Sequence, residues 1–175
     1  MKKLIFLLFS LLPSLCLGSD KEHKEKILRL LNGMYEVVSW YDGKTIHRPP
    51  DVAGRWAFFD GKIMSIIHNR INKENRKSSI KWGHAFISNS EFQYTYTETL
   101  NIKGSENSSI INHLIPWTGM RTFKLRLHDD ILYMTSNSGK QNWEISKSGI
   151  IYTDNAWGDE NIFVKRAWKR ITPLR

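Results

Sequence analysis

Two histidines in strand-like segments are the residues of this sequence best suited to chemistry. In the segments MSIIHNR (64–70) and KWGHAFIS (81–88), His68 shares a face with Met64 and Ile66, and His84 shares a face with Trp82 and Phe86. If both apolar faces point into one interior, two imidazoles share a cavity and can move a proton near neutral pH. Each can also be a hydrogen-bonded core residue or an outward-facing one. No His-x-x-x-His spacing occurs, so we predict neither a metal site nor a cofactor.

A tyrosine and a glutamate complete this possible acid–base set. Tyr94 and Glu98 have the same parity in the segment FQYTYTE (92–98), so a regular strand places both on one face. A buried carboxylate has a raised pKa and can act as a base. At the rim of the fold, Glu98 is an ordinary solvated carboxylate. The candidate catalytic residues, if the protein is an enzyme, are His68, His84, Tyr94 and Glu98.

Aromatic side chains recur through the same segments and suggest a binding site. A concave surface lined by aromatic residues, with a few polar groups to fix orientation, is the usual site for a small apolar ligand. A solid core without a cavity is the alternative. The candidate ligand-binding residues are Trp56, Phe58, His68, His84, Tyr94, Tyr96, Phe123 and Tyr133, with the two histidines orienting a polar end.

Several common catalytic motifs are missing from the sequence. It has no glycine-rich phosphate loop, no Gly-x-Ser-x-Gly elbow and no His-Glu-x-x-His. The common hydrolases and nucleotide-dependent enzymes are therefore disfavoured.

The N-terminus predicts export. A basic start is followed by an apolar run, and small residues precede a cleavage site after Gly18, so residues 1–18 are predicted to be a signal peptide. The run is too short for a membrane span. The compartment is then the periplasm or the outside of a bacterium. Lipidation at Cys16 is an alternative, but Leu15 is large for that motif. Cys16 is the only cysteine, so no disulfide is expected.

The formal net charge of +9 admits an anionic partner. Lysines and arginines are scattered over polar strand faces and turns, which is typical of a solvated basic surface, and we predict no nucleic-acid partner. A basic face that binds an anionic lipid or a cell-envelope polymer remains an alternative.

Periodicity divides the mature chain into a short helix and a series of hairpins. Residues 19–32 predict an amphipathic helix capped by Ser19 or Asp20, and residues 33–175 predict a single β domain. The hairpin around which the other predicted strands are organised follows the Pro116 corner. There Phe123 alternates with polar residues before the turn at Asp129 and Asp130. About eight to ten antiparallel strands at this spacing predict one all-β, up-and-down barrel, because closure removes exposed edges.

Four segments in this order resemble the lipocalin-like domains of the calycin group. They are LNGMYEVVSWYDGK (31–44), GRWAFFDGKIMS (54–65), HLIPWTGMRTFKLRLHDDILYMT (113–135) and AWKR (167–170). The resemblance implies a ligand-carrying barrel in which an arginine near the C-terminus packs on an aromatic residue of the first strand. Arg170 and Tyr35 are the counterparts, although Tyr35 replaces the usual tryptophan.

Together these features predict an exported lipocalin-like protein that binds a small apolar or aromatic molecule in its barrel. One alternative is an isomerase, cyclase or decarboxylase that uses the same interior. The other is the basic surface module described above. The sequence leaves the oligomeric state open.

Overall fold

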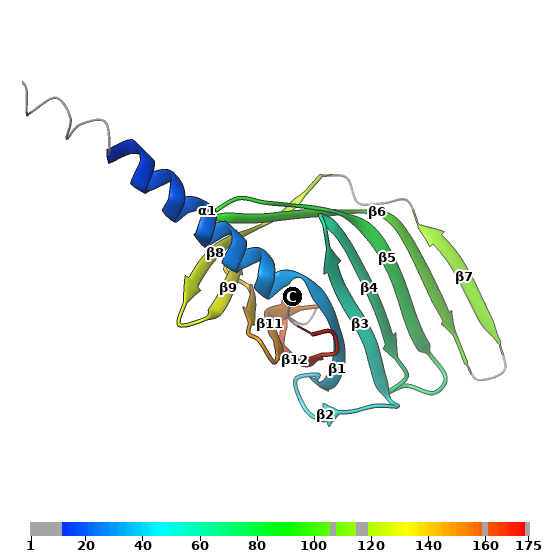
Figure 1. Ribbon diagram of the computed structural model, residues 1–175. Coiled ribbons are helices and arrows are strands. Elements are labelled where there is room, and N and C mark those ends of the chain that lie inside the picture. Colours follow the sequence, from blue (N-terminus) through cyan, green and yellow to red (C-terminus); the bar gives the residue numbers. More distant parts are fainter. Residues whose placement is uncertain (1–11, 106–107, 115–118, 159–160, 174–175) are drawn as a thin grey trace, which may run out of the picture.

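A closed antiparallel β-barrel forms the body of the molecule in a computed structural model of the chain (Figure 1). The structure describes residues 12–105, 108–114, 119–158 and 161–173. One helix, α1 (Leu12–Leu31), precedes the barrel. The strands are β1 (Gly33–Tyr41), β2 (Ile46–His47), β3 (Val52–Phe59), β4 (Lys62–Asn69), β5 (Arg76–Ile87), β6 (Glu91–Gly104), β7 (Ser109–Leu114), β8 (Arg121–His128), β9 (Ile131–Ser136), β10 (Gln141–Ile145), β11 (Gly149–Trp157) and β12 (Ile162–Arg170).

Ten of these strands make the barrel and follow one another in chain order. The order is β1-β3-β4-β5-β6-β8-β9-β10-β11-β12, and β1 pairs with β12 to close it, with Tyr35 opposite Arg170 and Trp40 opposite Arg166. The short β2 pairs only with β1, and β7 only with β6. The predicted all-β, up-and-down barrel with an N-terminal helix is confirmed.

Turn residues and period-2 alternation explain why the hairpins form where they do. In β8, Phe123 is buried while Lys124 and Arg126 are exposed. Asp129 and Asp130 adopt positive φ angles of 47° and 61°, as a tight turn into β9 requires. The Pro116 corner that was predicted to begin this hairpin lies outside the described residues.

Helix α1 closes one end of the barrel with its C-terminal turns. Ile27, Leu30 and Leu31 are buried in the core, and Lys26 Nζ lies 2.6 Å from a carboxylate oxygen of Asp130 in the β8–β9 turn. The helix begins at Leu12, so it is longer than predicted and continues through the expected cleavage site. Residues 1–11 of the predicted signal peptide lie outside the described residues. No helix among the described residues is both long and apolar enough to cross a bilayer.

The core is concentrated next to α1, in the same half of the barrel. Phe58 and Phe92 meet edge to face at 6.1 Å, and Phe123, Leu132 and Ile145 are all at most 1% exposed. Close packing of this kind holds a scaffold rigid. This solid end supports a second half of the barrel that is open.

Candidate functional site

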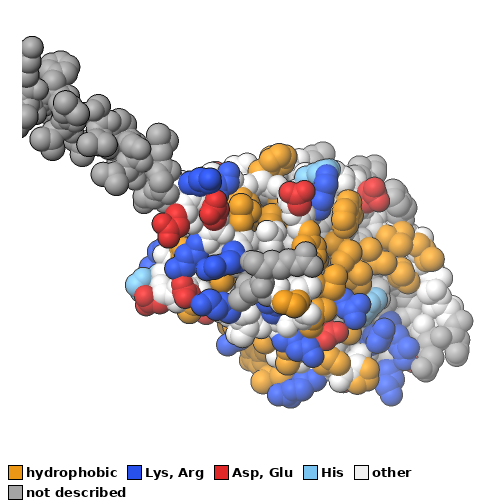
Figure 2. Space-filling view, viewed as in Figure 1, with side chains coloured by type: hydrophobic (Ala, Val, Ile, Leu, Met, Phe, Trp, Pro, Cys, Tyr) orange, Lys and Arg blue, Asp and Glu red, His pale blue; other side chains and the backbone are white. Residues whose placement is uncertain are grey.

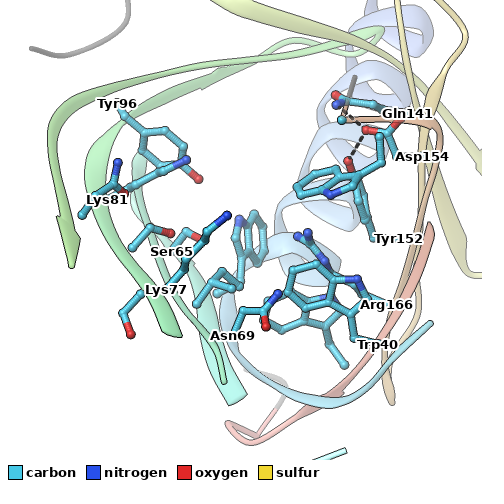
Figure 3. Close-up of a pocket in the computed structure, with 18 of the residues that line it drawn as sticks. Trp40, Ser65, Asn69, Lys77, Lys81, Tyr96, Gln141, Tyr152, Asp154 and Arg166 are labelled. Carbon is cyan, nitrogen blue, oxygen red and sulfur yellow. Dashed lines mark hydrogen bonds between the residues drawn. The ribbon is translucent and has the colours of Figure 1, made fainter. Parts of the chain in front are cut away.

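A cavity of about 620 Å³ occupies the half of the barrel away from α1 (Figure 3). Its walls come from nearly all the barrel strands, including β4–β6 on one side and β10–β12 on the other. The volume lies within the range of small-molecule sites, about 300–1,000 Å³. The barrel therefore has a filled end and a hollow end.

Aromatic rings form much of the cavity wall. Trp56 and Trp143 have ring centroids 5.6 Å apart, and Trp143 lies 4.7 Å from Tyr152. On the β6 side, Tyr94 and Tyr96 meet edge to face at 5.3 Å. Such rings offer flat apolar surface to a ligand with little loss of side-chain entropy.

Arg166 is the buried cation of the site. It is 9% exposed, and its guanidinium carbon lies 3.8 Å from the ring centroid of Trp40, 4.5 Å from that of Trp157 and 5.4 Å from that of Tyr152. Burial lowers the pKa of Arg166 to about 10, against the opposing effects of Tyr152 and Asp154, so it is charged at neutral pH. Cation–π attraction to several rings partly offsets its desolvation.

Asp154 faces the same cavity but already accepts three hydrogen bonds. Gln141 Nε2 and the Tyr152 hydroxyl each donate to Oδ2 at 2.9 Å, and the amide of Ala156 donates to Oδ1 at 2.9 Å. Figure 3 shows Gln141, Tyr152 and Asp154 together on one wall. The carboxylate therefore fixes its neighbours in place.

Lys81 projects from β5 into the opposite side of the cavity (Figure 3). Its ammonium lies 5.6 Å from the ring centroid of Tyr96. Burial, and then the nearby charges of Arg121 and Arg166, lower the pKa of Lys81. Three more basic residues line the cavity and are exposed to solvent. They are Lys77, Lys103 and Arg121.

Three of the predicted ligand-binding residues line the cavity, namely Trp56, Tyr94 and Tyr96. Phe58 and Phe123 are buried in the solid core beside α1. Tyr133 lies outside the barrel, between the inward residues Leu132 and Met134, with the guanidinium of Arg126 4.9 Å from its ring centroid. Aromatic content alone did not distinguish core, cavity and outer surface.

The two predicted histidines lie on the outside of the barrel. Inward-facing Ser65, Ile67 and Asn69 alternate with His68, so the apolar face that contains His68 points outward. His68 Nδ1 lies 2.8 Å from Ser78 Oγ, and burial followed by the charge of Arg70 lowers the pKa of His68.

His84 lies on the outer face of β5. Its Nδ1 lies 3.0 Å from Lys62 Nζ, and Trp82 and Phe86 on the same face are 43% and 60% exposed. Apolar side chains are visible on the surface in the region of β4 and β5 (Figure 2). The large apolar residues that share a face with His84 therefore lie on the outer face of β5. Alternation in the sequence does not show which face of a strand is the inner one.

Glu98 is exposed because a β-bulge reverses the parity of β6. Tyr96 is opposite Gly83 and Glu98 is opposite Trp82, so Thr97 is the extra residue. Tyr94 and Tyr96 precede the bulge and point inward, whereas Glu98 follows it and points outward. The residues His68, His84, Tyr94 and Glu98 therefore do not meet.

Trp40, Lys81 and Arg166 line the cavity but were not among the predicted site residues. The alternation of Val164, Arg166 and Trp168 along β12 could have indicated that this arginine shares a face with apolar residues. No comparable signal marks Lys81, because Lys77 and Ser79 on its own face of β5 are polar, whereas the apolar Ile80 and Trp82 lie on the opposite face.

Comparison with family models, curated proteins and solved structures finds no match to this chain. Among the described residues, no group of three or more histidine, cysteine, aspartate or glutamate side chains is arranged to hold a metal ion. The chemistry of the cavity walls is thus the basis for any functional assignment.

Proposed function

We propose that the barrel binds a small molecule with an apolar or aromatic body in its open half. The observation that carries this proposal is a cavity of about 620 Å³ with tryptophan and tyrosine rings on its walls. The packed end beside α1 keeps this cavity in a fixed shape, which reduces the entropy lost on binding. We also propose that the chain is related to lipocalin-like barrels and that residues 1–18 direct its export.

The lipocalin-like resemblance has one specific support in the structure. Arg170 lies over Tyr35 of the first strand, as the resemblance implies, with its guanidinium carbon 4.6 Å from the ring centroid. The meander of ten strands agrees with a ligand-carrying barrel. One fold can serve many chemistries, so the ligand class must come from the cavity itself.

The enzyme alternative has less support than binding. Of its four candidate groups only Tyr94 lines the cavity, and burial raises the pKa of Tyr94 above its usual value. A phenol with a raised pKa is a poor base near neutral pH. The Tyr152 hydroxyl, which also lines the cavity, already donates its hydrogen bond to Asp154.

Binding can be tested with the neutral fluorophore N-phenyl-1-naphthylamine, excited directly so that protein tryptophan does not contribute. We expect saturable emission with one site per chain. Ile67→Trp places a bulky ring inside the cavity and should weaken this signal. Ile66→Trp makes the same change at the neighbouring outward position and should retain it.

Thermal melts would show that both variants are folded. Equal binding by the Ile67→Trp and Ile66→Trp proteins would place the dye outside the cavity and contradict the proposal.

A further inference from the structure

Basic residues are distributed along the cavity from its solvent side to its interior. Five lining residues carry a positive charge and one, Asp154, a negative charge. Lys77, Lys103 and Arg121 are exposed, Lys81 is partly buried and Arg166 is buried. Charges of one sign that converge in a cleft focus the field and attract ions of the opposite sign.

The buried wall also contains hydrogen-bond donors without acceptors. The indole nitrogens of Trp40, Trp143 and Trp168 are buried and have no hydrogen-bond partner among the described residues. The Nε of Arg166 is in the same situation. All four side chains line the cavity. A buried donor without a partner costs about 1–3 kcal/mol, so such groups are unusual in a finished core.

The carboxylate on this wall hydrogen-bonds to other groups and not to these donors. Asp154 is engaged by Gln141, Tyr152 and the Ala156 amide. Within the described part of the chain, the Arg166 side chain contacts aromatic rings but has no ion-pair partner, and its Nε has no hydrogen-bond partner. An anionic group on a ligand can therefore supply the close counter-charge that the described residues do not give to the Arg166 side chain.

We propose that the ligand of this cavity carries an anionic head group, such as a carboxylate or sulfonate, that Arg166 binds directly, with Lys81 on the facing wall as a second cation. This inference rests on the proposed binding function and specifies its ligand class. The apolar body of the ligand lies against the rings of Trp56, Trp143 and Tyr94. Two features of the site agree with this assignment.

Arg166 is well suited to bind an anion. Its planar fork can donate two parallel hydrogen bonds to one anionic group, and stacking against Trp40 and Trp157 fixes its orientation. Lys81 is the second feature, because an anion between the two walls relieves the repulsion that Arg166 and Arg121 exert on it. A bound anion favours the protonated form of Lys81, and protonated Lys81 in turn attracts the anion.

Two dyes with the same scaffold isolate the anionic group. 1-Anilinonaphthalene-8-sulfonate carries a sulfonate that N-phenyl-1-naphthylamine lacks. We expect the sulfonate dye to bind at least about tenfold more tightly at pH 7, with one site per chain, since a charge-assisted hydrogen bond in a buried site contributes strongly. Competition between the two dyes would show that they share the cavity.

Three variants connect this preference to particular residues. Arg166→Met should remove the preference for the sulfonate dye and leave the neutral dye bound, and Lys81→Met should weaken sulfonate binding about three- to tenfold. Lys165→Met removes one positive charge from the adjacent, exposed position of β12 and should change neither affinity. Replacing a buried ion by a hydrophobic residue is often tolerated, and a thermal melt checks this for Arg166→Met.

The outcomes separate the two proposals. Equal affinities for both dyes, or a loss in Lys165→Met as large as in Arg166→Met, would overturn the anion-binding inference while the cavity remains a binding site. If neither dye binds, the proposed function fails and the inference falls with it. If Arg166→Met does not fold, an unchanged sulfonate preference in Lys81→Met overturns the inference as stated.

Discussion

Arg170 at the end of β12 lies over Tyr35 of β1 and joins the barrel to the helix that closes it. Its guanidinium donates hydrogen bonds to the carbonyls of Leu30 and Asn32 and to the Tyr35 hydroxyl. The Tyr35 hydroxyl in turn donates to the carbonyl of Leu30 at 2.6 Å. One arginine therefore satisfies carbonyls at the C-terminal end of α1 and stabilises the β1–β12 closure at the same place.

Removing this arginine should destabilise the whole barrel. We expect Arg170→Ala to lower the free energy of unfolding by about 2–4 kcal/mol, because hydrogen bonds from a charged donor are lost and carbonyls at the helix end lose their partner. Lys169→Ala is the matched control. Its ammonium lies 3.3 Å from Glu36 on the exposed face, and such pairs contribute less than about 1 kcal/mol. Urea unfolding measures both, and equal losses would contradict the prediction.

The position of Arg170 over Tyr35 also requires a glycine at residue 33. A Cβ atom at this position would lie 2.4 Å from Arg170 Nη1, and the backbone has a φ of 150°. Gly33→Ala should therefore lower the melting temperature and displace the arginine. Gly139→Ala has a positive φ of 71° but no atom within 4 Å of the added Cβ, so it gives the cost of a positive φ without a steric clash. A loss in Gly33→Ala no larger than that in Gly139→Ala would show that Arg170 moves aside freely.

Buried tyrosines should limit the stability of the protein at alkaline pH. Burial, against the effects of Arg170, raises the pKa of Tyr35 to about 12, and burial also raises the pKa values of Tyr94, Tyr96 and Tyr152. Because these pKa values are raised in the folded state, the stabilisation that the neutral buried tyrosines give is fully present below pH 10. It is lost as the pH rises from 10 through 12. Absorbance at 295 nm and circular dichroism should change together there, and tyrosine ionisation well before unfolding would contradict the prediction.

The barrel was predictable from the sequence because it depends on local signals. Turns such as Asp129–Asp130 and the alternation around Phe123 set the strands, and an even series of hairpins favours closure. The stacking of Arg170 on Tyr35 was predicted by resemblance and is confirmed.

The site was less predictable because alternation defines two faces without saying which is inside. On β5 the apolar face of Trp82 and Phe86 is outside, and the face of Lys81 lines the cavity. A single extra residue, Thr97, then exchanged the faces within β6 and moved Glu98 outward. Both assignments depend on pairing with neighbouring strands, which no one segment encodes.

This assignment of faces predicts opposite outcomes for two phenylalanines on adjacent strands. Phe92 of β6 is 1% exposed and packs on Phe58, so Phe92→Ala should cost about 3–5 kcal/mol through lost burial and the resulting cavity. Phe86 of β5 is 60% exposed, and Phe86→Ala should change stability by no more than about 0.5 kcal/mol. Urea unfolding of the two variants compares them directly. If Phe86→Ala were as costly as Phe92→Ala, the outer face of β5 would be covered, and the histidine on that face would have to be reconsidered as a buried group.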